Sequence, residues 1–113
     1  MGTQLEQYNE VMRCWGKIWK ELPDEIGAED SFVAKVYKDG ALSSKVKHLM
    51  ALAVALRAGC EGCMISHTKQ AVGNGATKAE VMETVVVAVA MGGTPAGSWA
   101  WRVVNVLEEL GKL

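Results

Sequence analysis

The sequence lacks an excess of charge of either sign: 12 Lys and Arg residues stand against 13 Asp and Glu residues, for a formal net charge of −1. Without a basic stretch, the chain has no electrostatic footprint for nucleic acid or an anionic membrane surface. The first residues also lack the basic flank and apolar run of an export signal. We therefore expect a cytoplasmic protein that binds neither nucleic acid nor a membrane.

A long unbroken hydrophobic run is missing as well. The longest uncharged stretch, residues 84–101, is divided by Gly92-Gly93-Thr94-Pro95 into pieces too short to span a bilayer. Half of the 113 residues are hydrophobic, which is enough for one modest core but not for a second domain. We expect one domain over residues 1–113, with N-terminal helices in 1–42 and a motif-bearing core in 43–113.

Strand patterns are scarce, and helix signals dominate. The β-branched run at residues 85–89 is preceded by a capping box, Thr77 and Glu80, and has no second strand-like run to pair with. Apolar periodicity and stop signals predict helices over about residues 4–22, 24–38, 44–58, 60–72, 78–91 and 95–110, with Ser43 and Thr94 as N-caps. The fold class is therefore all-α, a bundle of five to six helices.

The helices predicted over residues 44–58 and 78–91 are apolar on every side. So small a chain has too few other helices to cover both of them, and large exposed apolar faces commonly mark subunit contacts. We therefore expect a homo-oligomer.

Cysteine is sparse and odd in number, with three residues, which argues for a reducing compartment and against a disulfide framework. Two of them form the motif Cys60-Glu61-Gly62-Cys63, and His67 follows four residues later. On a helix these offsets place both thiols and the imidazole on one face. The pattern indicates redox chemistry, in which a thiolate attacks a peroxide and the resulting sulfenic acid condenses with the second thiol.

The residues alone leave the attacking sulfur open. Cys60 lies nearer the helix N-terminus, which favours its thiolate, whereas Cys63 lies one turn from His67. Inert structural thiols and a zinc site are the alternatives, and zinc would need His48, Cys14 or another subunit to complete four ligands. Cys14 is interpreted as a small core residue. We expect no metal and no cofactor.

Residues 45–100 resemble the carboxymuconolactone decarboxylase superfamily, and within it the AhpD-like alkylhydroperoxidase branch. The resemblance rests on four stretches: KVKHLMALAVA at 45–55, GCEGCMISHTKQA at 59–71, GATKAEV at 75–81 and GGTPA at 92–96. It implies an AhpD-like helical bundle whose single-repeat chains assemble as trimers or hexamers. It also implies a thiol-dependent peroxidase or disulfide oxidoreductase that reduces alkyl hydroperoxides.

The resemblance assigns the roles that the residues left open. In the AhpD-like branch the second cysteine attacks and the first resolves, which makes Cys63 the nucleophile and Cys60 the resolving thiol. His67 takes a place in the proton relay, and a dithiol partner of lipoyl or thioredoxin type reduces the disulfide. Family members usually carry a glutamate twelve residues before the first cysteine, where this chain has His48. An imidazole there can exchange protons with a different pH optimum, or leave a weaker peroxidase.

A second departure lies between the cysteines, where Glu61 and Gly62 stand in place of the relay histidine of the best-known branch. Two further hypotheses stand beside the peroxidase. One is a lactone decarboxylase, as in the namesake branch, whose chemistry does not need the cysteine pair. The other is a non-enzymatic helical scaffold or ligand-binding oligomer with structural thiols. Thiol reactivity distinguishes them, because a redox pair must cycle and a scaffold need not.

Overall fold

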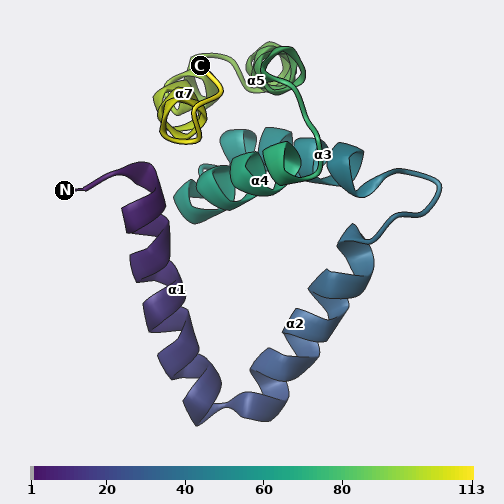
Figure 1. The fold of residues 1–113 in the computed structure, drawn as a ribbon, viewed down its shortest axis with the longest axis vertical. Helices are drawn as coiled ribbons and strands as arrows, with labels where there is room; N and C mark the ends of the chain where they lie inside the picture. The colour runs from purple at the N-terminus through teal and green to yellow at the C-terminus, as the bar shows by residue number, and fades with distance from the viewer. Residues whose placement is uncertain (1) are drawn as a thin grey trace.

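The computed structural model describes residues 2–113 as helices joined by short connections (Figure 1). In chain order they are α1 (Gln4–Glu21), α2 (Pro23–Tyr37), α3 (Ser44–Ala58), α4 (Glu61–Gly73), α5 (Lys78–Gly92), α6 (Thr94–Gly97) and α7 (Ala100–Glu109). Within residues 2–113 there is no strand, so the predicted all-α class is confirmed. None of the helices described there has the length and hydrophobicity needed to cross a bilayer.

Local sequence signals explain where the central helices begin and end. The hydroxyl of Ser43 caps α3 by accepting a hydrogen bond from the amide of Val46, at 3.2 Å. The predicted capping box opens α5: the Thr77 hydroxyl accepts from the Glu80 amide at 3.1 Å, and the Glu80 carboxylate accepts from the Thr77 amide at 2.8 Å. Gly59 ends α3 at a φ of 78°, a left-handed conformation that costs glycine little because it has no Cβ.

The single last helix predicted from residue 95 is wrong. The chain forms the four-residue α6, a turn at Ser98 and Trp99, and then α7. Thr94 is the first residue of α6 and not its N-cap, a position that Gly93 takes. The Ser98 hydroxyl donates to the Pro95 carbonyl at 2.9 Å, and the Trp99 amide donates to a carbonyl three residues earlier at 3.2 Å. These contacts tighten the turn and divert carbonyls from the α-helical pattern.

The hydrophobic core lies among α3, α4, α5 and α7. Its largest fully buried side chains are Leu52, Leu56, Met64, Val81, Val103 and Leu107. Burying an aliphatic side chain of this size contributes about 1.5–3 kcal/mol. α3 and α4 therefore form a fixed platform, and both helices supply residues to the site described below.

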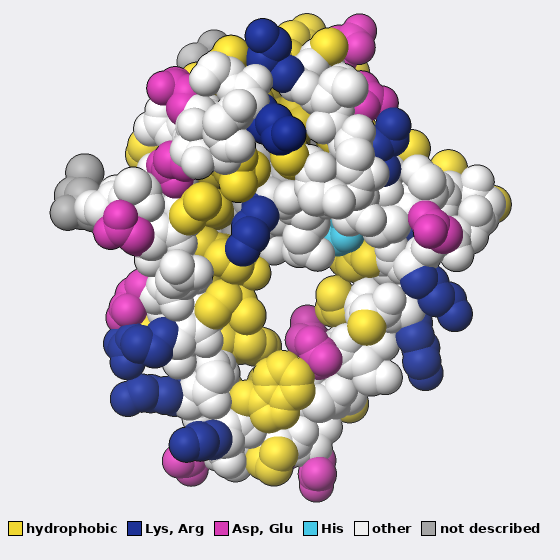
Figure 2. All heavy atoms as spheres, in the orientation of Figure 1, with side chains coloured by type: hydrophobic (Ala, Val, Ile, Leu, Met, Phe, Trp, Pro, Cys, Tyr) yellow, Lys and Arg dark blue, Asp and Glu magenta, His cyan; other side chains and the backbone are white. Residues whose placement is uncertain are grey.

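α1 and α2 leave this core as the two arms of a V that meet at Pro23 (Figure 1). α2 has no buried residue, and α1 buries only Gln4. α1 is fixed at its start, where the carboxylate of Glu109 in α7 accepts hydrogen bonds from the amides of Gln4 (2.8 Å) and Leu5 (2.9 Å). Figure 2 shows an opening between the arms and the core, with hydrophobic side chains along its border.

The arms explain one error of the sequence analysis. Cys14, interpreted there as a core residue, is exposed on α1. At this point α1 has already turned away from the core, so a position on an amphipathic helix is not buried within the chain.

Candidate redox site

The cysteine pair lies where the backbone enters α4. Cys60 is the N-cap residue, and its Sγ accepts a hydrogen bond from the amide of Cys63 at 3.3 Å. The two Cα atoms are 5.2 Å apart, and the sulfurs form a disulfide. When the pair is reduced, this amide and the helix N-terminus favour negative charge on the Cys60 sulfur.

Cys60 and Cys63 both line two separate cavities. One cavity of about 350 Å³ is lined by Cys60, Cys63 and His67 together with Tyr37 and small apolar residues of α3. The structure thus brings together the three residues that the motif spacing predicted. A second cavity of about 450 Å³ is lined by both cysteines and by residues of the two arms, among them Glu29.

His48 and His67 are in direct contact, although they come from different helices. Their Nδ1 atoms are 2.9 Å apart, so one nitrogen donates a hydrogen bond and the other accepts it. His48 is 3% exposed on α3, and His67 follows the cysteines on α4. The residue at the family's glutamate position is therefore joined to the motif histidine.

Tyr37, the last residue of α2, covers this pair of imidazoles. Its ring stacks on His48, with centroids 4.4 Å apart and planes 7° apart, and its centroid lies 5.1 Å from that of His67. Tyr37 could not be recognised as a site residue from the sequence, where it is only one of the residues on the apolar face of a predicted helix.

Burial keeps both imidazoles neutral in the disulfide form. Desolvation lowers the pKa of His48 below its usual 6.5. Desolvation, followed by the neighbouring His48, lowers the pKa of His67 to about 4. At neutral pH both imidazoles are therefore uncharged and are weaker bases than a free histidine, and the hydrogen bond between the two Nδ1 atoms is a path along which a proton can pass.

Glu61, between the two cysteines, turns toward α7 and forms an ion pair with Arg102. The Arg102 side chain is 12% exposed, and its Nη1 also donates to the side-chain oxygens of Gln4 (2.8 Å) and Gln7 (3.1 Å). Its Nε is buried and has no hydrogen-bond partner. One partly buried guanidinium thus joins the cysteine motif, α1 and α7.

Side chains suited to metal binding do not cluster in the described chain. Among residues 2–113, no group of three or more His, Cys, Asp or Glu side chains is placed to hold a metal ion. Structural zinc takes four ligands.

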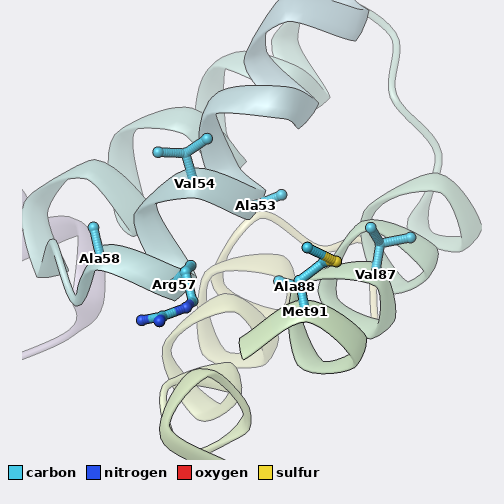
Figure 3. A pocket seen from close by; sticks show the side chains of 7 residues that line it. All are labelled: Ala53, Val54, Arg57, Ala58, Val87, Ala88 and Met91. Atoms are coloured by element: carbon cyan, nitrogen blue, oxygen red, sulfur yellow. The ribbon is translucent and has the colours of Figure 1, made fainter. Parts of the chain in front are cut away.

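A further cavity of about 350 Å³ lies between α3 and α5 (Figure 3) and shares Val54 and Ala58 with the cavity at the cysteine pair. It is lined by Ala53, Val54, Arg57, Ala58, Val87, Ala88 and Met91. Arg57 is the one charged side chain among them, and no thiol or imidazole lines it.

Fold and site together define an all-α protein with a vicinal cysteine pair at a helix N-terminus, beside two histidines. The model of the carboxymuconolactone decarboxylase family matches residues 30–105, and the chain belongs to this family. Its Cys-x-x-Cys-x-x-x-His motif is that of the AhpD-like branch.

Relatives from several bacteria share this architecture. An uncharacterized protein of Cupriavidus necator is 30% identical over 97% of this chain and 98% of its own length. Among solved structures, a carboxymuconolactone decarboxylase family protein of Legionella pneumophila has a TM-score of 0.89 at 33% identity, over 94% of this chain and 95% of that one. A family protein of Thermotoga maritima, for which a role in the antioxidative response has been suggested, has a TM-score of 0.83 at 27% identity, over 92% and 89%.

Proposed function

We propose that this chain is a thiol-dependent peroxidase or disulfide oxidoreductase that reduces alkyl hydroperoxides through Cys60 and Cys63. The observation that carries the proposal is a cysteine pair close enough to close a disulfide, on a cavity shared with His67. The antioxidative role suggested for the Thermotoga maritima relative agrees with it.

The proposed cycle has three balanced steps. The Cys63 thiolate attacks the hydroperoxide, the O–O bond breaks, and the products are a Cys63 sulfenic acid and, after protonation of the leaving alkoxide, an alcohol. The Cys60 thiolate then attacks the Cys63 sulfur and expels hydroxide, which leaves as water after protonation. A lipoyl- or thioredoxin-type dithiol finally reduces the disulfide and is itself oxidised. Overall, one hydroperoxide and one dithiol become alcohol, water and a disulfide.

The position of Cys60 suits the resolving role. Its sulfur accepts the Cys63 amide and sits at the helix N-terminus, which stabilises its thiolate. A stabilised thiolate is available to attack the sulfenic acid, and it is also the better leaving group when an external dithiol attacks the Cys63 sulfur. Both external reactants then meet the chain at Cys63.

The histidine pair provides the proton transfers. In this proposal His67 takes the Cys63 thiol proton and shares it with His48 across the 2.9 Å contact, although the burial that lowers the pKa of both imidazoles makes them weaker bases than a free histidine. The same proton is available for the leaving alkoxide. In this proposal His48 takes the place of the family's glutamate.

The testing experiment counts free thiols by alkylation and mass spectrometry, before and after one equivalent of an organic hydroperoxide. We expect two thiols to disappear, at Cys60 and Cys63, and a dithiol to restore them. Exposed Cys14 serves as the internal control because it lies on the arm, outside the motif. Cys63→Ser should abolish peroxide consumption and keep the helical circular dichroism, whereas Cys14→Ser should change neither.

Two results would count against the proposal. If all three thiols survive the hydroperoxide, the chain is not a peroxidase of this kind. If Cys63→Ser unfolds the protein, the pair has a structural role, as in the scaffold hypothesis.

We also propose that the chain acts as a homo-oligomer, a trimer or hexamer. The side chains on the outer faces of α3 and α5 are exposed and apolar: Met50, Val54, Val86, Val87 and Met91. Met91 is 80% exposed at the rim of the cavity in Figure 3. Light scattering should give a multiple of the 12.2 kDa chain mass, and Val54→Glu should reduce it; a monomeric wild type would contradict this assignment.

A further inference from the structure

Glu61 places a carboxylate inside the redox motif, next to Cys60 in the chain. A carboxylate beside a thiol disfavours the thiolate, because the two negative charges repel each other. The effect is smaller when the carboxylate is paired with a cation. Glu61 is 52% exposed and could turn into solvent, yet it is paired with Arg102 of α7.

Besides Glu61, the guanidinium of Arg102 contacts its neighbour Trp101 and two residues of α1. Its guanidinium carbon lies 4.5 Å from the ring centroid of Trp101, and its Nη1 donates to Gln4 and Gln7 of α1. Those partners are neutral, and among the ion pairs of residues 2–113 Glu61 is the one carboxylate that meets it. Arg102 is largely shielded from water whereas Glu61 is half exposed, so solvent screens part of their attraction and the ion pair acts mainly by fixing where the carboxylate lies.

We propose that Arg102 is a positioning residue of the redox site, which fixes and neutralises the Glu61 carboxylate and so favours the Cys60 thiolate. This inference rests on the proposed function, because it concerns the same cysteine pair. The other ionisable groups that line the cavities at the pair are Tyr8 and Glu29 from the arms, Tyr37, and His67, which contacts His48. None of them pairs with Glu61.

The test follows the alkylation rate of Cys60 in the reduced protein as a function of pH, with each thiol resolved by mass spectrometry. Arg102→Gln leaves the Glu61 carboxylate unpaired, and we expect the midpoint of the Cys60 profile to rise by roughly half a pH unit, about a threefold loss of thiolate below the midpoint. Glu61→Gln should lower the midpoint, because the positive charge of Arg102 then has no carboxylate partner and favours the Cys60 thiolate. The double variant and Arg102→Lys should both return it close to the wild-type value.

A matched variant distinguishes the effect of the ion pair on Cys60 from the effect of docking α1 against Arg102. Replacing Gln4 and Gln7 with Ala removes the contacts of Arg102 to α1 but keeps the ion pair, and we expect no shift of the Cys60 midpoint. A shift as large as that of Arg102→Gln would mean that docking of α1 sets the profile, and would overturn the inference. So would single variants that shift the midpoint in the same direction, or a double variant that is not restored.

Failure of the inference is distinguishable from failure of the proposed function. If wild-type Cys60 and Cys63 do not form a disulfide with peroxide, the proposed function fails. If they do, and the midpoint is the same in wild type, Arg102→Gln and Glu61→Gln, the inference alone fails. Cys14 reports on general changes, because its alkylation should be the same in all variants.

Discussion

The ring of Tyr37 lies flat on the imidazole of His48, with the centroids 4.4 Å apart and the planes 7° from parallel. The two residues belong to different parts of the fold: His48 is buried in α3, whereas α2 has no buried residue. An arm that contributes nothing to the core thus supplies the cover of the buried histidine pair. The electrostatics of the site depend on where this arm lies.

Removing the cover should therefore change the titration of both histidines. In Tyr37→Ala water reaches the imidazoles, and we expect the pKa values of His48 and His67 to rise toward 6.5, because desolvation is the main cause that lowers them. Tyr37→Phe keeps the stacked ring and should keep the low values. NMR titration of the imidazole protons measures both; unchanged values in Tyr37→Ala would assign the desolvation to α3 and α4 alone.

The same shifts predict how stability depends on pH. The folded state holds His67 at a pKa of about 4, below the 6.5 of an unfolded histidine, so the unfolded chain binds more protons between these values. The free energy of unfolding should be highest above pH 6.5 and fall by about 2–3 kcal/mol as the pH drops through 4. Urea unfolding at intervals of pH measures this. A double variant, His48→Gln with His67→Gln, should flatten the dependence between pH 6.5 and 5; an equally steep slope would place its origin elsewhere.

Restoring the family's acid at position 48 should strengthen the relay. In His48→Glu a carboxylate meets the Nδ1 of His67, which raises the pKa of that imidazole because an opposite charge favours its protonated form. We expect peroxide-dependent disulfide formation to accelerate about tenfold, measured by stopped-flow tryptophan fluorescence. His48→Gln has a similar size without the charge and should not accelerate it. An unchanged rate in His48→Glu would remove position 48 from the relay.

The anchor of α1 can be tested separately from the chemistry. Glu109→Gln removes the charge that meets the amides of Gln4 and Leu5, and leaves one acceptor where there were two. We expect a loss of about 1–2 kcal/mol in the free energy of unfolding, measured with urea. Glu108→Gln, the exposed neighbour, is the matched control and should have little effect. Equal effects of both variants would contradict a specific anchor.

Local sequence signals predicted the features that depend on only a few neighbouring residues, namely the helix boundaries and the placing of the cysteine motif. The boundaries of α1 to α5 fall within one residue of those predicted, because caps and stops such as Ser43 and Gly59 act within a few residues. The cysteine pair and His67 were also found, since they lie within two turns of one helix. The division of the last helix was missed, because a single Ser98 hydroxyl bond has no periodic signature.

Contacts between distant segments could not be read from the sequence in the same way. Tyr37 of α2 reaches His48, and Arg102 of α7 reaches Glu61, only when the chain folds. Neither the ring stacking nor the ion pair corresponds to a pattern in the sequence. Cys14 shows the converse: its helix has an amphipathic pattern, but the position faces away from the core of its own chain. Periodicity predicts which face of a helix is apolar, and not what covers it.

The bond between Glu109 and the amide of Gln4 spans a sequence separation of 105 residues. On the ribosome, α1 is therefore synthesised before its partners in α7, Glu109 and Arg102. Until they emerge, the start of α1 lacks its hydrogen bonds to Glu109 and Arg102, and the Glu61 carboxylate lacks its Arg102 partner. The start of α1 can therefore be fixed only after α7 has been made, so the Glu61–Arg102 ion pair beside the cysteines forms later in synthesis than the contact between His48 and His67.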